Sequence, residues 1–529
     1  MITTLRRSPG EGQDRKASQP AAVPSRVVVD ELRKLLQHSS HYLAGILASL
    51  GLGFISFPIF TRLFSVSDYG TIDLIAKVLL LLVAFSKLGL QQSALRFYDG
   101  RLFASDRLAA RRYYSTMLLS MVLSATCVMV LFWVVVGVSP KSLISRSLAV
   151  LLCLASVLIL VRALTSLFWV FLRVQEKTKF YSVFTVTTKA VSVLAICLSI
   201  LWFGRSVLAF YSGTIVVELA VAVVLSFILL RGGLVDIRSF DSTLLRTGLA
   251  FGLPLICYEL ASIILDAGDR VLVRHYLGAN TLGFYSLAYG MSDYVNNLLI
   301  VPINLALAPI YLRLWMTEGQ ASTSEFLSSG FDIFIMISVG IFAVVAATAH
   351  DAVTLFASSK YHGAEALIPT LVAGLLVYTS HSFLSAGLMI HKNTRTMAKL
   401  LAYSALFNIG LNCLLLPRIG VQAAAIATLL SYLFCVVLLA RASFKLLPLR
   451  IDVRAIARYG LGGIIAWYVA SRIGFSSSLA NLVARSVVAV ILYSGLVYAA
   501  DSRVRALPGH LLGRQSHHAE LPPLTATEG

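Results

Sequence analysis

Ionisable side chains stand inside some of the most apolar segments of this 529-residue sequence. The first half of the chain places mainly basic residues there and the second half acidic ones: Lys77, Lys87, Arg162 and Lys189 against Glu259, Asp266 and Asp293. A charged side chain at the centre of a membrane costs about 3 kcal/mol unless it faces protein or water. The basic set is typical of a site for a diphosphate or carboxylate, because cations replace the water that such an anion loses.

Helical geometry gathers four polar residues of the segment 71–97 on one face. At 100° per residue, Asp73, Lys77, Lys87 and Gln91 fall within a stripe roughly 80° wide. Such a stripe would be unstable in contact with lipid, so it predicts an interior path for a polar ligand. The alternative is a helix-packing face in which Asp73 and Lys77 form a local ion pair.

A later segment, 281–311, repeats this polar pattern. Ser286, Tyr289, Asp293 and Asn297 share one face at helical spacing, and two prolines interrupt the same helix. Discontinuous, polar helices at corresponding places in two halves of a chain indicate a transport site. We therefore expect these side chains to line a cavity.

The remaining charges support two interpretations. Glu259 and Asp266 are seven residues apart, about 20° on a helix, and we expect them to act with Asp293 in coupling to a proton or a sodium ion. Arg162 and Lys189 could extend the cationic cavity wall. They could instead reach the membrane surface or form structural pairs.

The elements that must hold these residues are membrane-spanning helices. The chain is 58% hydrophobic and 13% charged, and apolar runs of about 20 residues recur along it, so we predict an all-α protein with about fourteen spans. Lysine and arginine are concentrated in the loops on the side of both chain ends, which predicts cytoplasmic N- and C-termini. The same bias accounts for the net charge of +19 without a nucleic-acid partner, because these loops face anionic lipid.

Two charged stretches six spans apart indicate an internal repeat. "FTRLFSVSDYGTIDLIAK" and "DAGDRVLVRHYLGANTLGFYSLAYG" each place an arginine near a span end, Arg62 and Arg270, and a glycine before the next span, Gly70 and Gly283. This predicts two six-span halves related by an axis along the membrane normal. We expect Asp269 and Arg270 at the membrane edge, where they can pair and close an outer gate. The predicted units are a tail at 1–39, a first lobe at 40–240, a second lobe at 241–445, an extra helix pair at 446–501 and a tail at 502–529.

Three other kinds of chemistry find no support in the sequence. The six cysteines all lie in apolar runs, and none forms a CxxC pair. His350, His381 and His391 have no metal-ligand spacing, so we predict no metal and no other cofactor. There is no GxxxxGK[ST] phosphate-binding loop, and we expect a transporter that does not bind ATP rather than an enzyme.

Four stretches carry a resemblance to a known family: "FPIFTRLFSVSDYGTIDLIAK", "GLQQSALRFY", "GLPLICYELASIILDAGDRVLVRHYLGANTLGFYSLAYG" and "APIY". With them the chain resembles the bacterial polysaccharide-biosynthesis flippases, the Wzx-type branch of the MOP exporter superfamily. The resemblance implies two six-helix lobes around a central cationic cavity, and alternating access coupled to protons or Na⁺. It implies a substrate as well, an undecaprenyl-diphosphate-linked oligosaccharide that is flipped across the inner membrane for a polysaccharide such as an O-antigen or exopolysaccharide.

By the same resemblance, Arg62, Arg96 and Arg270 join Lys77 and Lys87 as cavity or gate residues. We expect a monomer surrounded by membrane lipids, in contact with polymerase or chain-length proteins of the same pathway. The first alternative is a small-molecule or cation antiporter of the same superfamily, which the basic stripe disfavours. A membrane glycosyltransferase, such as a polymerase or ligase, is a further alternative, but the predicted outer loops are too short to fold alone.

Overall fold

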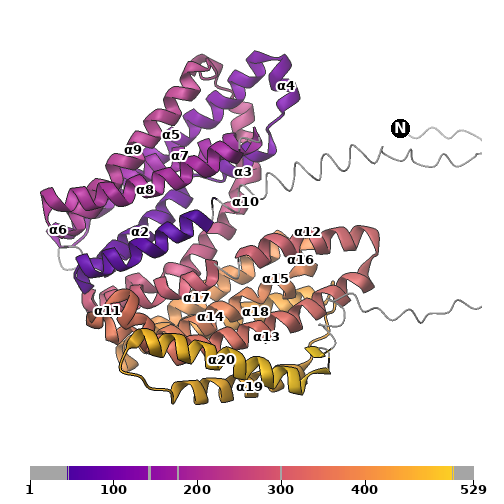
Figure 1. The fold of residues 1–529 in the computed structure, drawn as a ribbon. Coiled ribbons are helices and arrows are strands. Elements are labelled where there is room, and N and C mark those ends of the chain that lie inside the picture. The colour runs from indigo at the N-terminus through magenta and orange to yellow at the C-terminus, as the bar shows by residue number, and fades with distance from the viewer. Residues whose placement is uncertain are drawn as a thin grey trace, which may run out of the picture.

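The computed structural model describes residues 45, 47–140, 145–175, 178–297, 301–502 and 504–505. The predicted tail at 1–39 lies outside these residues, as does nearly all of the predicted tail at 502–529. The described part of the chain folds into helices joined by short connections, with no strand (Figure 1). By length and composition, ten of these helices can cross a membrane, and two shorter apolar helices accompany them. The all-α, multi-pass prediction is confirmed.

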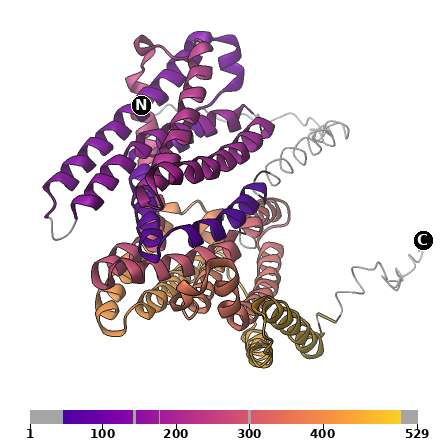
Figure 2. The ribbon, with the colours of Figure 1, turned by 60° about the vertical axis from the view of Figure 1, so that its left-hand side comes forward.

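The first six predicted spans form one bundle, called the first lobe (indigo to magenta in Figures 1 and 2). Its elements are an apolar helix at Leu47–Leu63, α2 (Val66–Ser86), α3 (Leu90–Arg96), α4 (Gly100–Ser105), α5 (Arg107–Val138), α6 (Arg146–Ala155), α7 (Val157–Val174), α8 (Thr178–Phe203) and α9 (Val207–Arg231). Polar caps begin several of these helices, because a side-chain oxygen satisfies the first free N–H groups. Asp106, for example, accepts from the backbone N–H groups of Leu108 and Ala109 at the start of α5.

The second bundle, called the second lobe, holds the next six predicted spans and the extra pair. Its elements are α10 (Ser242–Ala267), α11 (Asp269–Val295), α12 (Val301–Thr317), α13 (Gln320–Ala352), α14 (Ile368–Thr379), α15 (His381–Leu384), α16 (Ala386–Ile390), α17 (Thr394–Ile419), α18 (Gln422–Phe444), α19 (Val453–Ser471) and α20 (Ser478–Ala500). The extra pair, α19 and α20, packs against α13 (Figure 1). Two short turns, η3 (Val353–Ala357) and η4 (Ser359–Ala364), connect α13 to α14.

The predicted single helix over 71–97 is wrong, because the chain breaks after α2. Leu88 and Gly89 both have left-handed backbone angles, with φ of 47° and 71°. A Cβ on Gly89 would collide with the backbone of Gly252 in α10, so a glycine is needed at this crossing. The helical periodicity of α2 therefore does not continue across the break, and the predicted stripe of Asp73 does not extend to Gln91 in α3.

The predicted loop between the seventh and eighth spans is also wrong. Helix continues from Asp269 to Gly278, whose φ of 82° makes the first real turn. Asp269 and Arg270 consequently lie on a helix within the protein, 0% and 1% exposed, and not in a loop. The predicted span at 281–311 is itself divided, since α11 ends at Val295 and α12 begins at Val301.

The two lobes meet along α2 and α11, and the repeated glycines lie at that contact. A Cβ on Gly70 would stand 2.6 Å from the backbone nitrogen of Gly283, and a Cβ on Gly283 would collide with the carbonyl of Val66. Two helices can approach this closely only through small residues. The equivalent positions of the two predicted repeats thus pack directly on each other. Below, the end of the molecule that carries η3 and η4 is called the outer end, after the predicted topology, and the opposite end is called the inner end.

Candidate functional site

Three ion pairs connect α2 of the first lobe, and the residue after it, to α10 and the start of α11 in the second. Each joins a sequence-predicted site residue of one lobe to one of the other: Asp73 Oδ2 to Arg270 Nε at 3.2 Å, Lys77 Nζ to Asp266 Oδ2 at 3.6 Å, and Lys87 Nζ to Glu259 Oε1 at 2.8 Å. Sequence reasoning expected a basic wall facing a separate acidic wall, or a local Asp73–Lys77 pair. In the structure, Asp73, Lys77 and Lys87 instead each pair with a residue of the second lobe.

Arg270 is the most buried of the six residues in these three ion pairs, with 1% of its side chain exposed. It donates to the carboxylate of Asp269 at 2.9 Å and to the carbonyl of Asp266 at 2.6 Å, and its guanidinium lies 4.0 Å from the ring centre of Tyr289. Tyr285 in turn donates to Asp269. A buried charge is tolerated only when partners surround it in this way. The expected pair of Asp269 with Arg270 does form.

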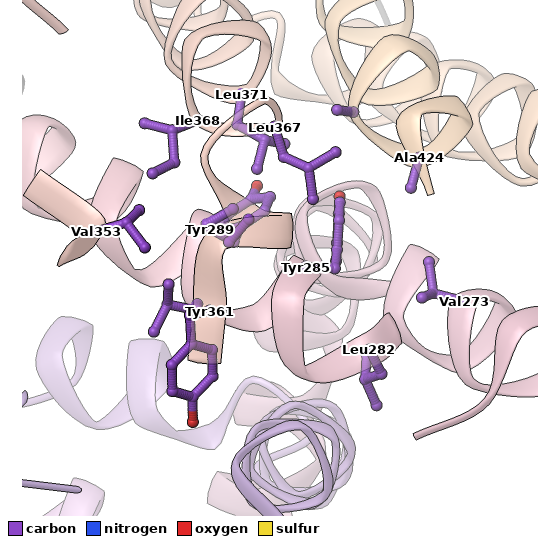
Figure 3. Close-up of a cluster of buried hydrophobic side chains, with 14 of the residues drawn as sticks. Val273, Leu282, Tyr285, Tyr289, Val353, Tyr361, Leu367, Ile368, Leu371 and Ala424 are labelled. Carbon is purple, nitrogen blue, oxygen red and sulfur yellow. The ribbon is translucent and has the colours of Figure 1, made fainter. Parts of the chain in front are cut away.

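Asp266 joins the ion pairs to a group of buried tyrosines. Its carboxylate accepts from the hydroxyl of Tyr289 at 2.6 Å and from that of Tyr432 at 3.3 Å, and the two hydroxyls are 2.9 Å apart. Figure 3 shows Tyr285 and Tyr289 side by side on α11, within the apolar cluster at the lobe contact. Tyr289, expected to line a cavity, is 1% exposed and part of this network, and Ser286 is also buried.

A cavity of about 440 Å³ in the second lobe lies next to this network. Asp266, Asp293 and Asn297 line it together with Tyr378 and His381. Within the described part of the chain, the Asp293 carboxylate has no cationic partner closer than 4 Å, and Asn297 donates to the Asp293 carbonyl at 2.8 Å. Of the three expected ion-coupling residues, the structure brings Asp266 and Asp293 to one cavity. Glu259 is paired with Lys87 nearer the inner end.

Arg162 and Lys189 are not part of the lobe interface. Arg162 of α7 forms two 2.8 Å hydrogen bonds with Glu218 of α9, inside the first lobe. Lys189 of α8 lines the same first-lobe cavity as that pair. The expected cationic wall is therefore divided between two places.

Two arginines carried over from the family resemblance lie near the ends of the spans. Arg96 ends α3 and is exposed, with its guanidinium 4.6 Å from the ring centre of Phe251. Arg62 is exposed at the outer end and donates to the carbonyl of Leu355 at 2.8 Å. Neither arginine joins the three ion pairs.

The outer end is closed by the connection between α13 and α14. Lys360 donates to the carbonyl of Phe64 at 2.7 Å, and Arg62 binds this connection from the first lobe. The rings of Tyr69 and Tyr361 meet edge to face at 6.0 Å. In Figure 3 the Tyr361 hydroxyl points toward the purple helices of the first lobe. These contacts link the lobes at the end opposite to Glu259 and Lys87.

Three side chains at the outer end, one from the end of α13 and two from the connection, could hold a metal ion, although sequence spacing did not indicate them. The ligand atoms of His350, His362 and Glu365 all lie within 4.8 Å of one another. His350 Nδ1 is 2.6 Å from a Glu365 carboxylate oxygen, and the set is largely exposed. The two histidines are separated by η3 and part of η4, whose course no periodicity predicts.

Sequence reasoning missed two residues of α18 that reach the buried network. Thr428 donates to Asp269 at 3.1 Å, and Tyr432 contacts Asp266 and Tyr289. The two are four residues apart and so share a helix face. A search for hydroxyl side chains at this spacing would have found them.

A family model described as "Polysaccharide biosynthesis protein" matches residues 35–315, more than half of the chain. No curated protein sequence matches. Among solved structures, the fold is similar to the lipid II flippase MurJ in an inward closed conformation, with a TM-score of 0.61 and 14% identity over 88% of this chain and 99% of that chain. An inward-facing multidrug resistance MATE family transporter of the MOP superfamily has a TM-score of 0.59 and 15% identity, over 74% of this chain and 97% of that chain. An outward-facing multidrug resistance MATE family transporter has a TM-score of 0.54 and 12% identity, over 77% of this chain and 95% of that chain.

Proposed function

The chain belongs to the polysaccharide biosynthesis protein family, and we propose that it flips an undecaprenyl-diphosphate-linked oligosaccharide from the cytoplasmic to the periplasmic leaflet of the bacterial inner membrane. The observation that carries this proposal is the row of ion pairs across the lobe interface. Two of its cations, Lys77 and Lys87, are partly exposed, at 19% and 14%. They stand on the inner-end side of the closed outer connection, where an anion from the cytoplasmic leaflet would arrive.

A diphosphate would bind by competing with the carboxylates of the second lobe. Lys87 Nζ lies 2.8 Å from a Glu259 carboxylate oxygen, and Lys77 Nζ lies 3.6 Å from an Asp266 carboxylate oxygen. A phosphate oxygen is an equally good charge-assisted acceptor, and a diphosphate can engage both lysines together. The ion pairs then separate, and the two lobes are no longer held to each other at these points.

Cation coupling follows from the same exchange. Once Lys77 and Lys87 bind phosphate, Asp266 and Glu259 lack their compensating charge, which favours the uptake of a proton or Na⁺. Asp293 shares a cavity with Asp266 and can share the incoming cation. We propose that this uptake accompanies substrate binding, and that release of both at the periplasmic side restores the ion pairs.

Alternating access requires the outer connection to open. The contacts of Lys360 with Phe64 and of Arg62 with Leu355 must break, because they join the lobes at the outer end. The Gly70–Gly283 contact lies close to these bonds and is a candidate pivot.

A second candidate function, antiport of a small organic cation, has one observation in its favour. The 440 Å³ cavity of the second lobe is lined by two carboxylates, Asp266 and Asp293, and by the aromatic side chain of Tyr378. A cation can bind such a set by charge and by contact with the aromatic faces. Under this alternative, Asp293 would be essential and Lys87 would not.

The test is a flipping assay in proteoliposomes with fluorescent undecaprenyl-diphosphate-linked oligosaccharide. We expect Lys87→Ala and Lys77→Ala each to lower the flipping rate at least about tenfold, because each removes a charge-assisted contact. Lys445→Ala, an exposed lysine beyond the end of α18, is the matched control. Normal rates in both lysine variants would overturn the proposal. Lost transport of a cationic dye only in Asp293→Asn would favour the antiporter.

A further inference from the structure

The first lobe contains a cavity of about 620 Å³, separate from the ion pairs of the lobe interface. It lies between α7, α8, α9 and the helix at Leu47–Leu63. Pockets that enclose a small organic ligand commonly have volumes of about 300–1,000 Å³. Three charged side chains line it, Arg162, Glu218 and Lys189. Several hydroxyl side chains line it as well, among them Thr165 and Thr188.

The hydroxyl groups are arranged to accept hydrogen bonds. Those of Thr165 and Thr185 donate to carbonyls of the preceding helical turn, at 2.7 and 2.8 Å, which leaves their lone pairs available on the cavity side. The hydroxyl of Ser49 is buried and, within the described part of the chain, has no hydrogen-bond partner. A ligand that carries several hydroxyl donors would satisfy this lining.

Charged groups add acceptors and donors at fixed positions. Arg162 and Glu218 form a planar two-bond pair that leaves part of each group facing the cavity, at 32% and 23% exposure. Lys189 is exposed and has no ion-pair partner among the described residues. The set has a net positive charge, which disfavours an organic cation.

An aromatic side chain supplies the apolar part of the cavity. Trp169 of α7 lines it and is held by an edge-to-face contact with Tyr181 at 4.9 Å. An indole offers a flat, rigid apolar face and a single N–H donor. A sugar ring has the complementary shape, with C–H groups on its faces and hydroxyls around its edge.

The cavity and the proposed diphosphate site lie on neighbouring helices. Arg162 of the cavity belongs to α7, and α7 packs against α2, the helix that carries Lys77. We infer that the first-lobe cavity binds sugar units of the lipid-linked substrate, while Lys77 and Lys87 hold its diphosphate. This inference rests on the proposed function and adds a saccharide subsite to it.

The experiment measures binding of two lipids to the purified full chain in detergent. One probe is undecaprenyl diphosphate without sugar, and the other is undecaprenyl diphosphate carrying the oligosaccharide of the cells from which it is extracted. We expect the sugar-bearing lipid to bind more tightly, and the ratio of the two affinities to fall about tenfold in Trp169→Leu, with the affinity for the bare lipid unchanged. Thr188→Val, a smaller change, should lower the ratio severalfold. Trp202→Leu, at a side chain 86% exposed on the same helix as Thr188, is the control and should keep it.

The outcomes separate the two proposals. If Trp169→Leu and Thr188→Val both keep the wild-type ratio, or if the wild type does not distinguish the lipids, the saccharide subsite is wrong. If both variants weaken the two lipids equally, the cavity does not recognise sugar, and the inference is again overturned. Failure of the proposed function looks different: the bare lipid does not bind to the wild type, or Lys77→Ala does not weaken it.

Discussion

Two ion pairs of nearly equal length have different places in the molecule. Lys87 and Glu259 are 2.8 Å apart and join the first lobe to the second. Arg485 of α20 and Asp351 of α13 are 2.7 Å apart and join the extra helix pair to the second lobe. A pair within one rigid unit can stay closed through a transport cycle, whereas a pair between lobes must open. The comparison teaches that ion pairs of the same length differ in whether they join the lobes, and under the proposed function only those that join the lobes take part in transport.

The largest expected effect is on stability, and it concerns Arg270. Arg270→Ala leaves the buried carboxylate of Asp269 without its cation, and Asp73 loses the same partner. Removing one partner of a buried pair costs about 3–5 kcal/mol. We expect a lower midpoint of thermal unfolding in detergent. Arg274→Ala, whose side chain only donates to the Thr71 hydroxyl, should change the midpoint much less. Equal effects would show that burial of Arg270 is not what stabilises the contact.

The comparison itself can be tested with two double substitutions. Lys87→Met with Glu259→Met, and Arg485→Met with Asp351→Met, each replace an ion pair by apolar side chains, a change that is often neutral for stability. We expect the flipping rate to fall at least about tenfold in the first and to remain near wild type in the second. Both proteins should keep their thermal midpoints within a few degrees. Similar rates in the two double variants would contradict the distinction between the pairs.

A methyl group added at the contact of α2 and α11 tests whether the outer connection depends on that contact. Gly283→Ala inserts a methyl group against the Val66 carbonyl, and overpacking of this kind costs about 1–3 kcal/mol. The lobes should separate at the outer end, and hydrogen exchange of the connection at 353–365 should become faster. Gly410→Ala is the control, because nothing lies within 4 Å of a Cβ at that position of α17. Unchanged exchange in Gly283→Ala would show that the outer connection does not depend on this contact.

The smallest expected effect concerns one side chain of the outer closure. Lys360→Ala removes the hydrogen bond to the Phe64 carbonyl, worth about 1 kcal/mol. We expect a severalfold rise in the hydrogen exchange rate of residues 353–365, with no change in thermal midpoint. Lys392→Ala, on an exposed turn at the inner end, should leave exchange at 353–365 as it is.

The all-α, multi-pass fold could be predicted from the sequence, because the length of an apolar run is a local property of the chain. The repeat was also visible, through Gly70 and Gly283, although not their direct contact. The helix at Asp269–Leu277 was missed because its residues are polar for a span. They are helical here since the protein interior supplies partners for Asp269 and Arg270.

The candidate site was predictable as a list of residues but not as an arrangement. Helical spacing placed Lys77 and Lys87 on one side of their segment, and both do form ion pairs with α10. Spacing within one helix could not identify Asp266 and Glu259 as their partners, because these residues belong to the other lobe. Tyr432 reaches Asp266 from 166 positions along the chain. The prediction that Gln91 continues the polar stripe failed because the helix breaks at Leu88 and Gly89. That break accompanies the close approach of Gly89 to Gly252, which the sequence of one helix does not reveal.

The three lobe-spanning ion pairs differ in their access to water, and this sets an order of events. Arg270 at the outer side is 1% exposed, while Glu259 toward the inner end is 36% exposed. Attraction between charges strengthens as water is excluded. The two lysine pairs are similarly accessible, with Lys77 19% and Lys87 14% exposed, so only the Arg270 pair is shielded from water. Under the proposed function, an anion would separate the two lysine pairs while Arg270 still joins the lobes.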